Sequence, residues 1–379
     1  MYVTRADKIP PFLVMDVLEK AKNLEQKGAK VIHLEIGEPD FNTPKKIAKA
    51  AIEAINRGET HYTHSLGIYE LRSAITKHYK KRYGVKISPE QVVVTMGVSP
   101  ALLLTLCALV NAGDEVILSN PTYACYPNFV RYIDGNPVFV PVAADNGFIL
   151  EPDKIQESIT PKTRAIIINS PSNPTGAVLP SDVMRDLARL KPYIISDEIY
   201  HGLVYGENEH SILEFTDRAF VVNGFSKLYA MTGWRLGYII APPEFVRPIQ
   251  KSQQNLFICA GSVSQWAGVS ALTEEHPEVE EMVTTYNKRR IFMIDALRKL
   301  GFKIAREPKG AFYILADASH LSKDSHWLAF DILEKAKVAV TPGIDFGAEG
   351  FLRFSYANSI ENIKEGCKRL KEYIKLTNP

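Results

Sequence analysis

The chain has 379 residues, enough for two domains of ordinary size. Apolar residues make up 46% of it and charged residues 23%, a composition that excludes a disordered or fibrous chain. The 45 basic and 43 acidic residues leave a formal net charge of +2, too balanced to favour a nucleic acid or a membrane surface as partner. We therefore expect a globular protein that acts on small molecules, without nucleic-acid or membrane partners.

The cysteines and the apolar runs point to a cytoplasmic protein. The four cysteines lie far apart and form no CxxC pair, which argues against a disulfide framework and a zinc site. The longest mostly aliphatic run, residues 101–110, is shorter than the roughly 20 residues that span a bilayer. Asp7 and Asp16 interrupt any apolar region that a signal peptide would need. The cysteines are Cys107, Cys125, Cys259 and Cys367.

From about residue 91 the sequence alternates short β-branched runs with longer helical patterns. Several of these runs are continuously apolar, as is typical of strands buried on both faces. This alternation predicts an α/β fold, with a mostly parallel sheet between two layers of helices. The predicted strands are 91–95, 115–118, 137–142, 164–169, 193–197 and 219–223, and a helix is predicted over 100–110.

The last hundred residues show a different pattern, which predicts a smaller α+β domain. A long charged helix is expected over 278–300 and a closing helix from about Ile360. Short strands are predicted near 302–305, 311–315, 338–341 and 351–355. The expected division is an N-terminal arm with part of the small domain (1–45), a large domain (46–280) and a small C-terminal domain (281–379).

The most informative segment is NGFSKLYAMTGWRLG, residues 223–237, in which Lys227 closely follows an apolar strand and Arg235 comes eight positions later. Burying an ammonium group is costly and lowers its pKa. A lysine neutralised in this way is a nucleophile suited to forming a Schiff base with a carbonyl. A single loop lysine is more often exposed to solvent, so the interpretation depends on its neighbours.

Other polar residues follow predicted strands of the same sheet. Asp197 ends the run YIISD, and Asn173 lies in NSPSNPTG after another strand. Open α/β sheets bind ligands at the carboxyl ends of their strands, although singly these residues could be a helix cap and a turn residue. The segment GVSP at 97–100 opens a helix whose free N–H groups could hold a phosphate. Together they predict one ligand site.

This combination resembles the fold-type-I, pyridoxal-phosphate (PLP)-dependent aminotransferases of class I/II, the aspartate-aminotransferase-like family. The resemblance covers essentially the whole chain and implies a large domain with a mostly parallel sheet plus a smaller α+β domain. It also implies that the amino group of an L-amino acid moves to a 2-oxo acid, through a ping-pong cycle of PLP and its pyridoxamine form. The matching motifs are IGEPD at 36–40, NPTG at 173–176, DEIY at 197–200 and FLRFSY at 351–356.

The resemblance implies roles toward the ring of the cofactor. Lys227 is similar to the catalytic lysine that binds the cofactor as a Schiff base and moves the proton of the substrate Cα. Asp197 resembles the carboxylate that keeps the pyridine nitrogen protonated. Tyr200 and Asn173 resemble the pair that hydrogen-bonds the O3′ group, and Tyr123 the aromatic residue that stacks on the ring.

The resemblance also implies how the cofactor phosphate is held. Arg235 and the backbone of Val98 and Ser99 would bind it, by guanidinium hydrogen bonds and a helix N-terminus respectively. Tyr62 resembles a tyrosine that reaches the phosphate of the neighbouring subunit, which implies a homodimer with shared active sites. Many relatives have a phosphate-binding serine three residues before the lysine, whereas this sequence has Gly224.

For the substrate, Arg353 resembles the arginine that binds the α-carboxylate, beside Asn173, and Gly37 lets the backbone approach the substrate closely. The apolar residues 11–13, on an arm that relatives fold over the active site, favour aromatic or aliphatic amino acids. Ser99 offers no cation for a second carboxylate. Aspartate, alanine and diaminopimelate-type substrates remain alternatives.

Two other functions stay open at this point. A C–S β-lyase or a synthase on the same scaffold would share the lysine, aspartate and arginine. A non-catalytic ligand sensor, such as half of a transcription regulator, would need a separate DNA-binding domain, whereas the family motifs begin within the first forty residues. The HxxH spacing of His61 and His64 lacks a helical or strand context, so no metal site is expected.

Overall fold

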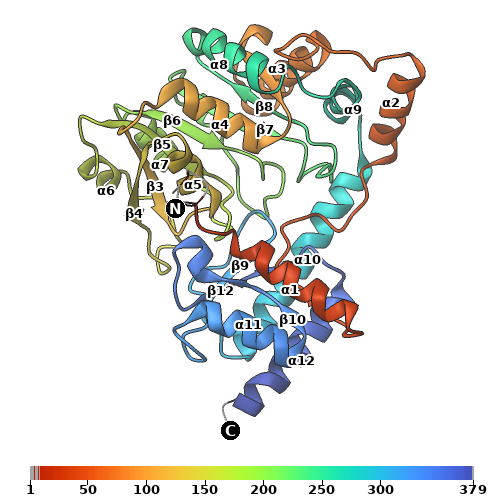
Figure 1. Ribbon diagram of the computed structural model, residues 1–379, viewed down its shortest axis with the longest axis vertical. Helices are drawn as coiled ribbons and strands as arrows, with labels where there is room; N and C mark the ends of the chain where they lie inside the picture. Colours follow the sequence, from red (N-terminus) through yellow and green to blue (C-terminus); the bar gives the residue numbers. More distant parts are fainter. Residues whose placement is uncertain (1–3, 5–6, 8, 378–379) are drawn as a thin grey trace.

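The computed structural model describes Thr4, Asp7 and residues 9–377, which form a large helix-covered sheet and a smaller group of strands and helices below it (Figure 1). The large sheet has seven strands, and all run parallel except β8, which is antiparallel to both of its neighbours. In spatial order they are β2 (Val92–Thr95), β8 (Gly237–Ile240), β7 (Ala219–Gly224), β6 (Tyr193–Asp197), β5 (Thr163–Asn169), β3 (Glu115–Asn120) and β4 (Asn136–Pro141).

Both faces of this sheet are buried, which explains its continuous apolar runs. In β5, Ile166 and Ile168 pack into one hydrophobic cluster, while Ile167 between them packs into another on the opposite face. The cluster of Ile167 includes residues of α4 (Val98–Leu109) and α8 (Pro243–Leu256), and the other includes residues of α3 (Tyr69–Tyr83) and α9 (Ser262–Thr273). Residues of α6 (Pro152–Glu157) and α7 (Ser181–Ala188) also join the cluster of Ile166, α5 (Cys125–Tyr132) packs against β3 and β4, and α2 (Lys45–Asn56) packs against α9.

The smaller group is built on a three-stranded antiparallel sheet in the order β11, β12, β9. A two-stranded parallel pair joins β1 to β10, so the N-terminal segment lies against C-terminal elements, as the red helix α1 shows in Figure 1. The elements are α1 (Leu13–Gln26), β1 (Ile32–His33), α10 (Pro277–Lys299), β9 (Tyr313–Asp317), α11 (Ser325–Ala336), β10 (Val338–Ala339), β11 (Thr341–Pro342), β12 (Phe351–Ser355) and α12 (Ile360–Thr377).

The strand predicted at 302–305 is wrong. Only Lys303 forms an isolated bridge, with Asp317 at the end of β9, and no ladder develops. The alternation that resembled a strand arises because Phe302 and Ile304 are buried in the core while their neighbours are exposed. The sequence analysis also missed β8, a run of only four residues between the edge strand β2 and β7.

The predicted domain boundaries after residues 45 and 280 stay a prediction. Residues 1–3, 5–6 and 8 of the predicted N-terminal arm and residues 378–379 of the predicted C-terminal domain lie outside the described residues. Within the ranges described above, no helix combines the length and the apolar character needed to cross a bilayer.

Candidate active site

A cavity of about 400 Å³ lies where several strands of the large sheet end and extends to the smaller sheet. The turns after β5 and β7 supply Asn173 and Lys227, and the last residue of β6 is Asp197, because parallel strands bring their carboxyl ends to one edge. The smaller sheet supplies Arg353 from β12. The predicted site residues that line this cavity are Gly37, Val98, Ser99, Tyr123, Asn173, Asp197, Tyr200, Lys227, Arg235 and Arg353.

Lys227 presents its amine to this cavity. Its Nζ donates a hydrogen bond to the carbonyl oxygen of Gly37 at 2.6 Å. Burial lowers the pKa of Lys227 to about 8, and the positive charges of Arg353 and Arg235 act in the same direction against Glu38 and Asp197. The side chain touches the open space of the cavity, yet the surrounding protein keeps it poorly solvated. At pH 7, one unit below this pKa, about a tenth of the lysine is therefore the free amine, which is the nucleophilic form.

Asp197 is buried, with 4% of its surface exposed, and no basic side chain among the described residues bonds to it. Its Oδ2 accepts a hydrogen bond from the Tyr126 hydroxyl at 2.7 Å, and its Oδ1 accepts one from the Ile199 N–H at 3.1 Å. Burial raises the pKa of Asp197 to about 6, although these two hydrogen bonds act in the opposite direction. Such a carboxylate gains from pairing with a cationic nitrogen placed in the cavity.

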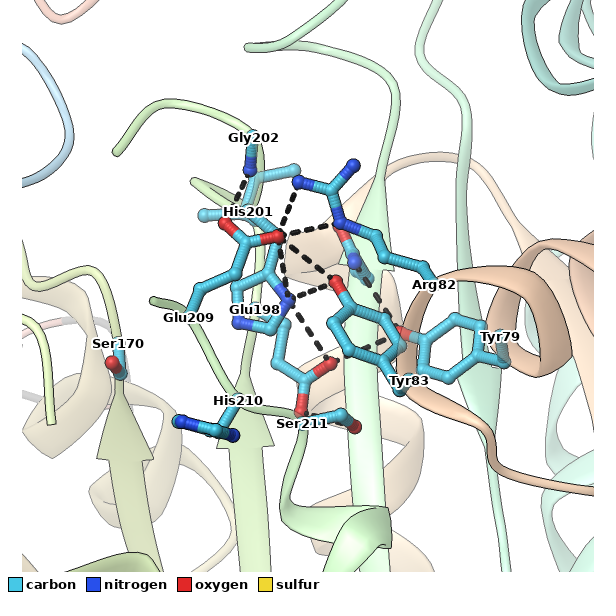
Figure 2. Close-up of polar contacts among 12 residues, drawn as sticks. Tyr79, Arg82, Tyr83, Ser170, Glu198, His201, Gly202, Glu209, His210 and Ser211 are labelled. Carbon is cyan, nitrogen blue, oxygen red and sulfur yellow. Dashed lines mark hydrogen bonds and ion pairs between the residues drawn. The ribbon is translucent and has the colours of Figure 1, made fainter. Parts of the chain in front are cut away.

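A buried polar network that starts at Glu198, the residue after Asp197, holds this end of β6 in place (Figure 2). The side chain of Glu198 is fully buried and accepts hydrogen bonds from the Tyr79 hydroxyl (3.1 Å), the Ser211 hydroxyl (2.9 Å) and the Ile212 N–H (3.1 Å). Because two distant segments of the chain bond to one carboxylate, the backbone beside Asp197 is tied to its surroundings.

A second carboxylate, Glu209, extends the same network (Figure 2). It accepts hydrogen bonds from the Arg82 Nε and the Gly202 N–H, both at 2.6 Å. His201 lies between the two carboxylates, with its Nδ1 2.6 Å from the Tyr83 hydroxyl and 3.6 Å from Glu198. The network thus fixes the turn that follows Asp197 and carries Tyr200.

Arg353 is a buried cation without a carboxylate partner among the described residues. Its Nη1 donates to Asn173 Oδ1 at 2.9 Å, and its Nη2 donates to the Glu35 carbonyl oxygen at 2.5 Å and the Thr341 hydroxyl at 3.2 Å. Its Nε has no hydrogen-bond partner. A buried charge that only neutral groups satisfy is costly, and an anionic ligand would compensate it.

A second arrangement of groups that would suit an anion lies at the start of α4. Gly97 precedes this helix with a φ of +99°, and no side chain caps the helix N-terminus. A Cβ at Gly97 would lie 2.8 Å from Arg235 Nη2, so only glycine lets the guanidinium lie against this turn. The cation and the free N–H groups of Val98 and Ser99 therefore face the same space, which suits a phosphate.

The glycine at position 224 also has a structural reason. A Cβ there would lie 2.9 Å from the Leu236 carbonyl oxygen and 3.1 Å from Gly237 Cα, because β7 and β8 pair closely at this point. The serine that many relatives carry would not fit here without a backbone shift. Ser226, which lines the cavity, is the serine nearest to the lysine.

Tyr62 is the predicted site residue that the structure does not bring to this cavity. Its side chain is 81% exposed and projects from the segment between α2 and α3. Conversely, the cavity contains Tyr126 and Tyr313, which the sequence analysis did not single out. Tyr126 follows Tyr123 by one helical turn, a spacing that could have indicated a shared face, whereas Tyr313 resembles an ordinary core residue of a strand.

The donor set fits PLP. The α4 N-terminus with Arg235 suits a phosphate, the buried Asp197 suits a protonated ring nitrogen, and the Lys227 amine suits an aldehyde. Arg353 remains for a carboxylate of a second ligand.

Comparisons with known proteins agree with this reading of the cavity. Residues 29–370 match the family model of aminotransferase class I and II. The chain is 44% identical over 369 residues to a (5-formylfuran-3-yl)methyl phosphate transaminase of Methanocaldococcus jannaschii, a match that covers 96% of each protein. It is 38% identical over 373 residues to an aspartate/prephenate aminotransferase of Thermus thermophilus, again with 96% of each covered.

A solved structure from Methanococcus jannaschii, described as similar in its active site to kynurenine aminotransferases, superposes with a TM-score of 0.92 at 43% identity. This superposition covers 99% of the present chain and 100% of the other. The predicted fold type and the predicted transfer of an amino group are confirmed, and the substrates are an amino acid and a 2-oxo acid. The chain belongs to the PLP-dependent class I and II aminotransferases of fold type I.

Proposed function

We propose that the cavity around Lys227 is the active site, at which an L-amino acid with an aromatic or aliphatic side chain donates its amino group to a 2-oxo acid. The observation that carries this proposal is the presence in one cavity of a lysine with a lowered pKa, a buried carboxylate and a buried arginine without a counter-ion. The residues concerned are Lys227, Asp197 and Arg353.

The cofactor, when bound, supplies an electron sink for the pair left on the substrate Cα after its proton is removed. Asp197 would hold the ring nitrogen, and Tyr200 with Asn173 would hold the O3′ oxygen. Arg235, with the N–H groups of Val98 and Ser99, would hold the phosphate, and the Tyr123 ring would cover one ring face.

Lys227 would move the proton. Its pKa of about 8 is close to neutral pH, so Nζ can both take up and release a proton during one turnover. The carbonyl oxygen of Gly37, 2.6 Å from Nζ, orients the amine toward the N-terminal wall of the cavity, to which Gly37 belongs.

The walls of the cavity support the choice of substrate. Apolar side chains from the N-terminal arm and α1 line one side: Phe12, Val14, Met15 and Leu18. The cations on the described lining are Lys227, Arg235 and Arg353, and the proposed roles use all three. No lining cation remains for a second carboxylate, so an apolar side chain would be preferred over an acidic one.

The test is a panel of amino donors against 2-oxoglutarate, pyruvate and oxaloacetate, followed by single-turnover absorbance changes. Because a relative is named for aspartate and prephenate, aspartate and glutamate belong in the panel. Phenylalanine, tyrosine and leucine should give a higher kcat/KM than aspartate. A preference for aspartate would overturn the substrate choice and leave the aminotransferase activity standing.

We also propose a cytoplasmic homodimer. Tyr62 is exposed and lies outside the cavity of its own chain, and apolar Ile52, Ile55 and Tyr69 are exposed on the helices before and after it. A second subunit that covers this region would bury these side chains and bring Tyr62 to the partner's phosphate site. The cytoplasmic location stays a prediction from the sequence.

A further inference from the structure

Tyr313 contacts both Arg353 and Tyr200. In the proposed function Arg353 binds the substrate carboxylate and Tyr200 binds the cofactor. Tyr313 lies on β9, which pairs with β12 so that Leu315 faces Arg353. Because side chains two residues apart share a face, Tyr313 is a diagonal neighbour of Arg353. Its ring centroid lies 4.3 Å from the Arg353 guanidinium carbon, and its hydroxyl lies 2.9 Å from the Tyr200 hydroxyl.

We propose that Tyr313 is a positioning residue with two separable tasks, in which its ring orients Arg353 for the substrate carboxylate and its hydroxyl orients Tyr200 for the cofactor. This inference rests on the proposed function, since it takes the roles of Arg353 and Tyr200 from there.

The task of the ring follows from how Arg353 is held. The guanidinium also lies 4.8 Å from the Phe346 ring centroid, so two aromatic rings contact it. A guanidinium over an aromatic face is held by cation–π attraction while its N–H groups stay in its own plane. The rings therefore fix the plane in which a carboxylate can accept two parallel hydrogen bonds.

The task of the hydroxyl follows from the hydrogen bond between Tyr313 and Tyr200, in which only one of the two hydroxyl groups can be the donor. Tyr200 and Tyr313 are both buried, and burial raises the pKa of each phenol, so both keep their protons at neutral pH. One hydrogen joins the two oxygens. If Tyr313 supplies it, the hydrogen of Tyr200 is free to point into the cavity, and donation from Tyr313 makes Tyr200 a stronger donor.

The close fit around this hydroxyl supports a specific placement. Gly37 packs against Tyr313, and a Cβ at position 37 would overlap the Tyr313 hydroxyl oxygen. The same glycine accepts the hydrogen bond from Lys227. The tyrosine hydroxyl thus lies at the meeting point of the segments that carry Gly37, Tyr200 and Arg353.

Two substitutions separate the tasks. Tyr313→Phe removes the hydroxyl and keeps the ring, whereas Tyr313→Leu removes both. Both variants should raise the pKa of the absorbance change of the bound cofactor by about half to one unit, because the O3′ oxygen loses part of its hydrogen bond. Only Tyr313→Leu should weaken binding of 3-phenylpropanoate, an unreactive carboxylate, by about three- to thirtyfold.

Tyr205→Phe is the matched control. Tyr205 is a buried tyrosine with a hydroxyl bonded to the Ala311 carbonyl oxygen and an arginine, Arg290, over its ring, but it does not line the cavity. It should change neither the absorbance pKa nor carboxylate binding. Thermal unfolding of each variant identifies general destabilisation. If Tyr313→Leu does not fold, Tyr313→Phe still tests the inference by a shifted pKa with unchanged carboxylate affinity.

Reference variants distinguish the two proposals. If Arg353→Lys leaves 3-phenylpropanoate binding unchanged, or Tyr200→Phe leaves the absorbance pKa unchanged, the proposed function itself is wrong. If those variants behave as expected but Tyr313→Phe shifts nothing, or weakens carboxylate binding as much as Tyr313→Leu, the inference about Tyr313 is overturned alone.

Discussion

Asp345 caps helix α1 across 332 positions of the sequence: its Oδ1 accepts a hydrogen bond from the Leu13 N–H at 3.1 Å. Its Oδ2 accepts a second from the Val14 N–H at 3.3 Å, and Phe12, at the N-cap position, provides no cap of its own. Because Val14 and the following turn of α1 line the cavity, this carboxylate fixes one wall of the proposed substrate site.

Asp345→Ala should therefore loosen the arm without disturbing the cofactor. Loss of a helix cap costs about 1 kcal/mol, and here the cost falls on the first turn of α1. We expect faster proteolysis before residue 13 and a KM for apolar donors raised severalfold, with kcat little changed. Asp16→Ala, in the first turn of α1 but outside the cap that Asp345 forms, is the control. A changed kcat with an unchanged KM would contradict this role.

Lys227 should be the residue that binds the cofactor covalently. Borohydride reduction of the yellow enzyme, followed by peptide mapping, should place the cofactor on Lys227, since it is the lysine that lines the cavity. Lys227→Ala should still bind the cofactor through its other contacts but lose proton transfer almost completely. Finding the reduced cofactor on another lysine would show that Lys227 does not bind it covalently.

Because Asp197 titrates near pH 6, we expect cofactor binding to depend on pH. Its carboxyl, with a pKa of about 6, is charged above pH 6 and neutral below it, so cofactor affinity of the apoenzyme should fall as pH drops from 7 to 5. Asp197→Asn mimics the neutral form and should weaken binding about ten- to a hundredfold at pH 7.5, the range of a charge-assisted hydrogen bond. Fluorescence titrations across this pH range check it.

The Asn variant also serves as the control, because the phosphate of the cofactor titrates in the same range for both proteins. The difference between the two pH profiles isolates Asp197. Profiles that fall in parallel would show that the carboxylate does not contribute.

Arg353→Lys keeps the positive charge but loses the planar guanidinium, which can donate two parallel hydrogen bonds to a carboxylate. It should weaken the amino-acid and 2-oxo-acid half-reactions together, by about ten- to a hundredfold, at about 1.36 kcal/mol per decade. Single-turnover titrations with one donor and one keto acid measure both. An amine without a carboxylate should be unaffected, and an equal loss with that amine would mean that Arg353 does not bind the carboxylate.

The shared-site proposal predicts complementation between subunits. Mixing inactive Tyr62 and Lys227 variants should restore part of the activity, because a hybrid dimer has one site with both defects and one site with neither. Subunit exchange, followed by mass spectrometry, is the control. Exchange without any recovery of activity would show that Tyr62 serves its own chain or no site.

The sequence predicted the residues that strand ends bring together, and missed those that depend on contacts between distant segments. Asn173, Asp197 and Lys227 each follow an apolar strand closely, so a parallel sheet alone places them at one edge. Tyr313 and Asp345 carry no such local signal. Tyr313 lies beside Arg353 because β9 pairs with β12, and Asp345 accepts its hydrogen bond from a helix at the other end of the chain. Their roles follow from tertiary pairing, which one sequence does not reveal.

Because the buried Arg353 has no carboxylate partner among the described residues, the resting enzyme can bind small organic acids from the solution there. Acetate, formate or citrate in a purification buffer would occupy the same fork as either substrate, in competition with both. Apparent KM values would then rise with the concentration of buffer acid while kcat stayed constant. Rankings of donors obtained in different buffers would therefore not be comparable.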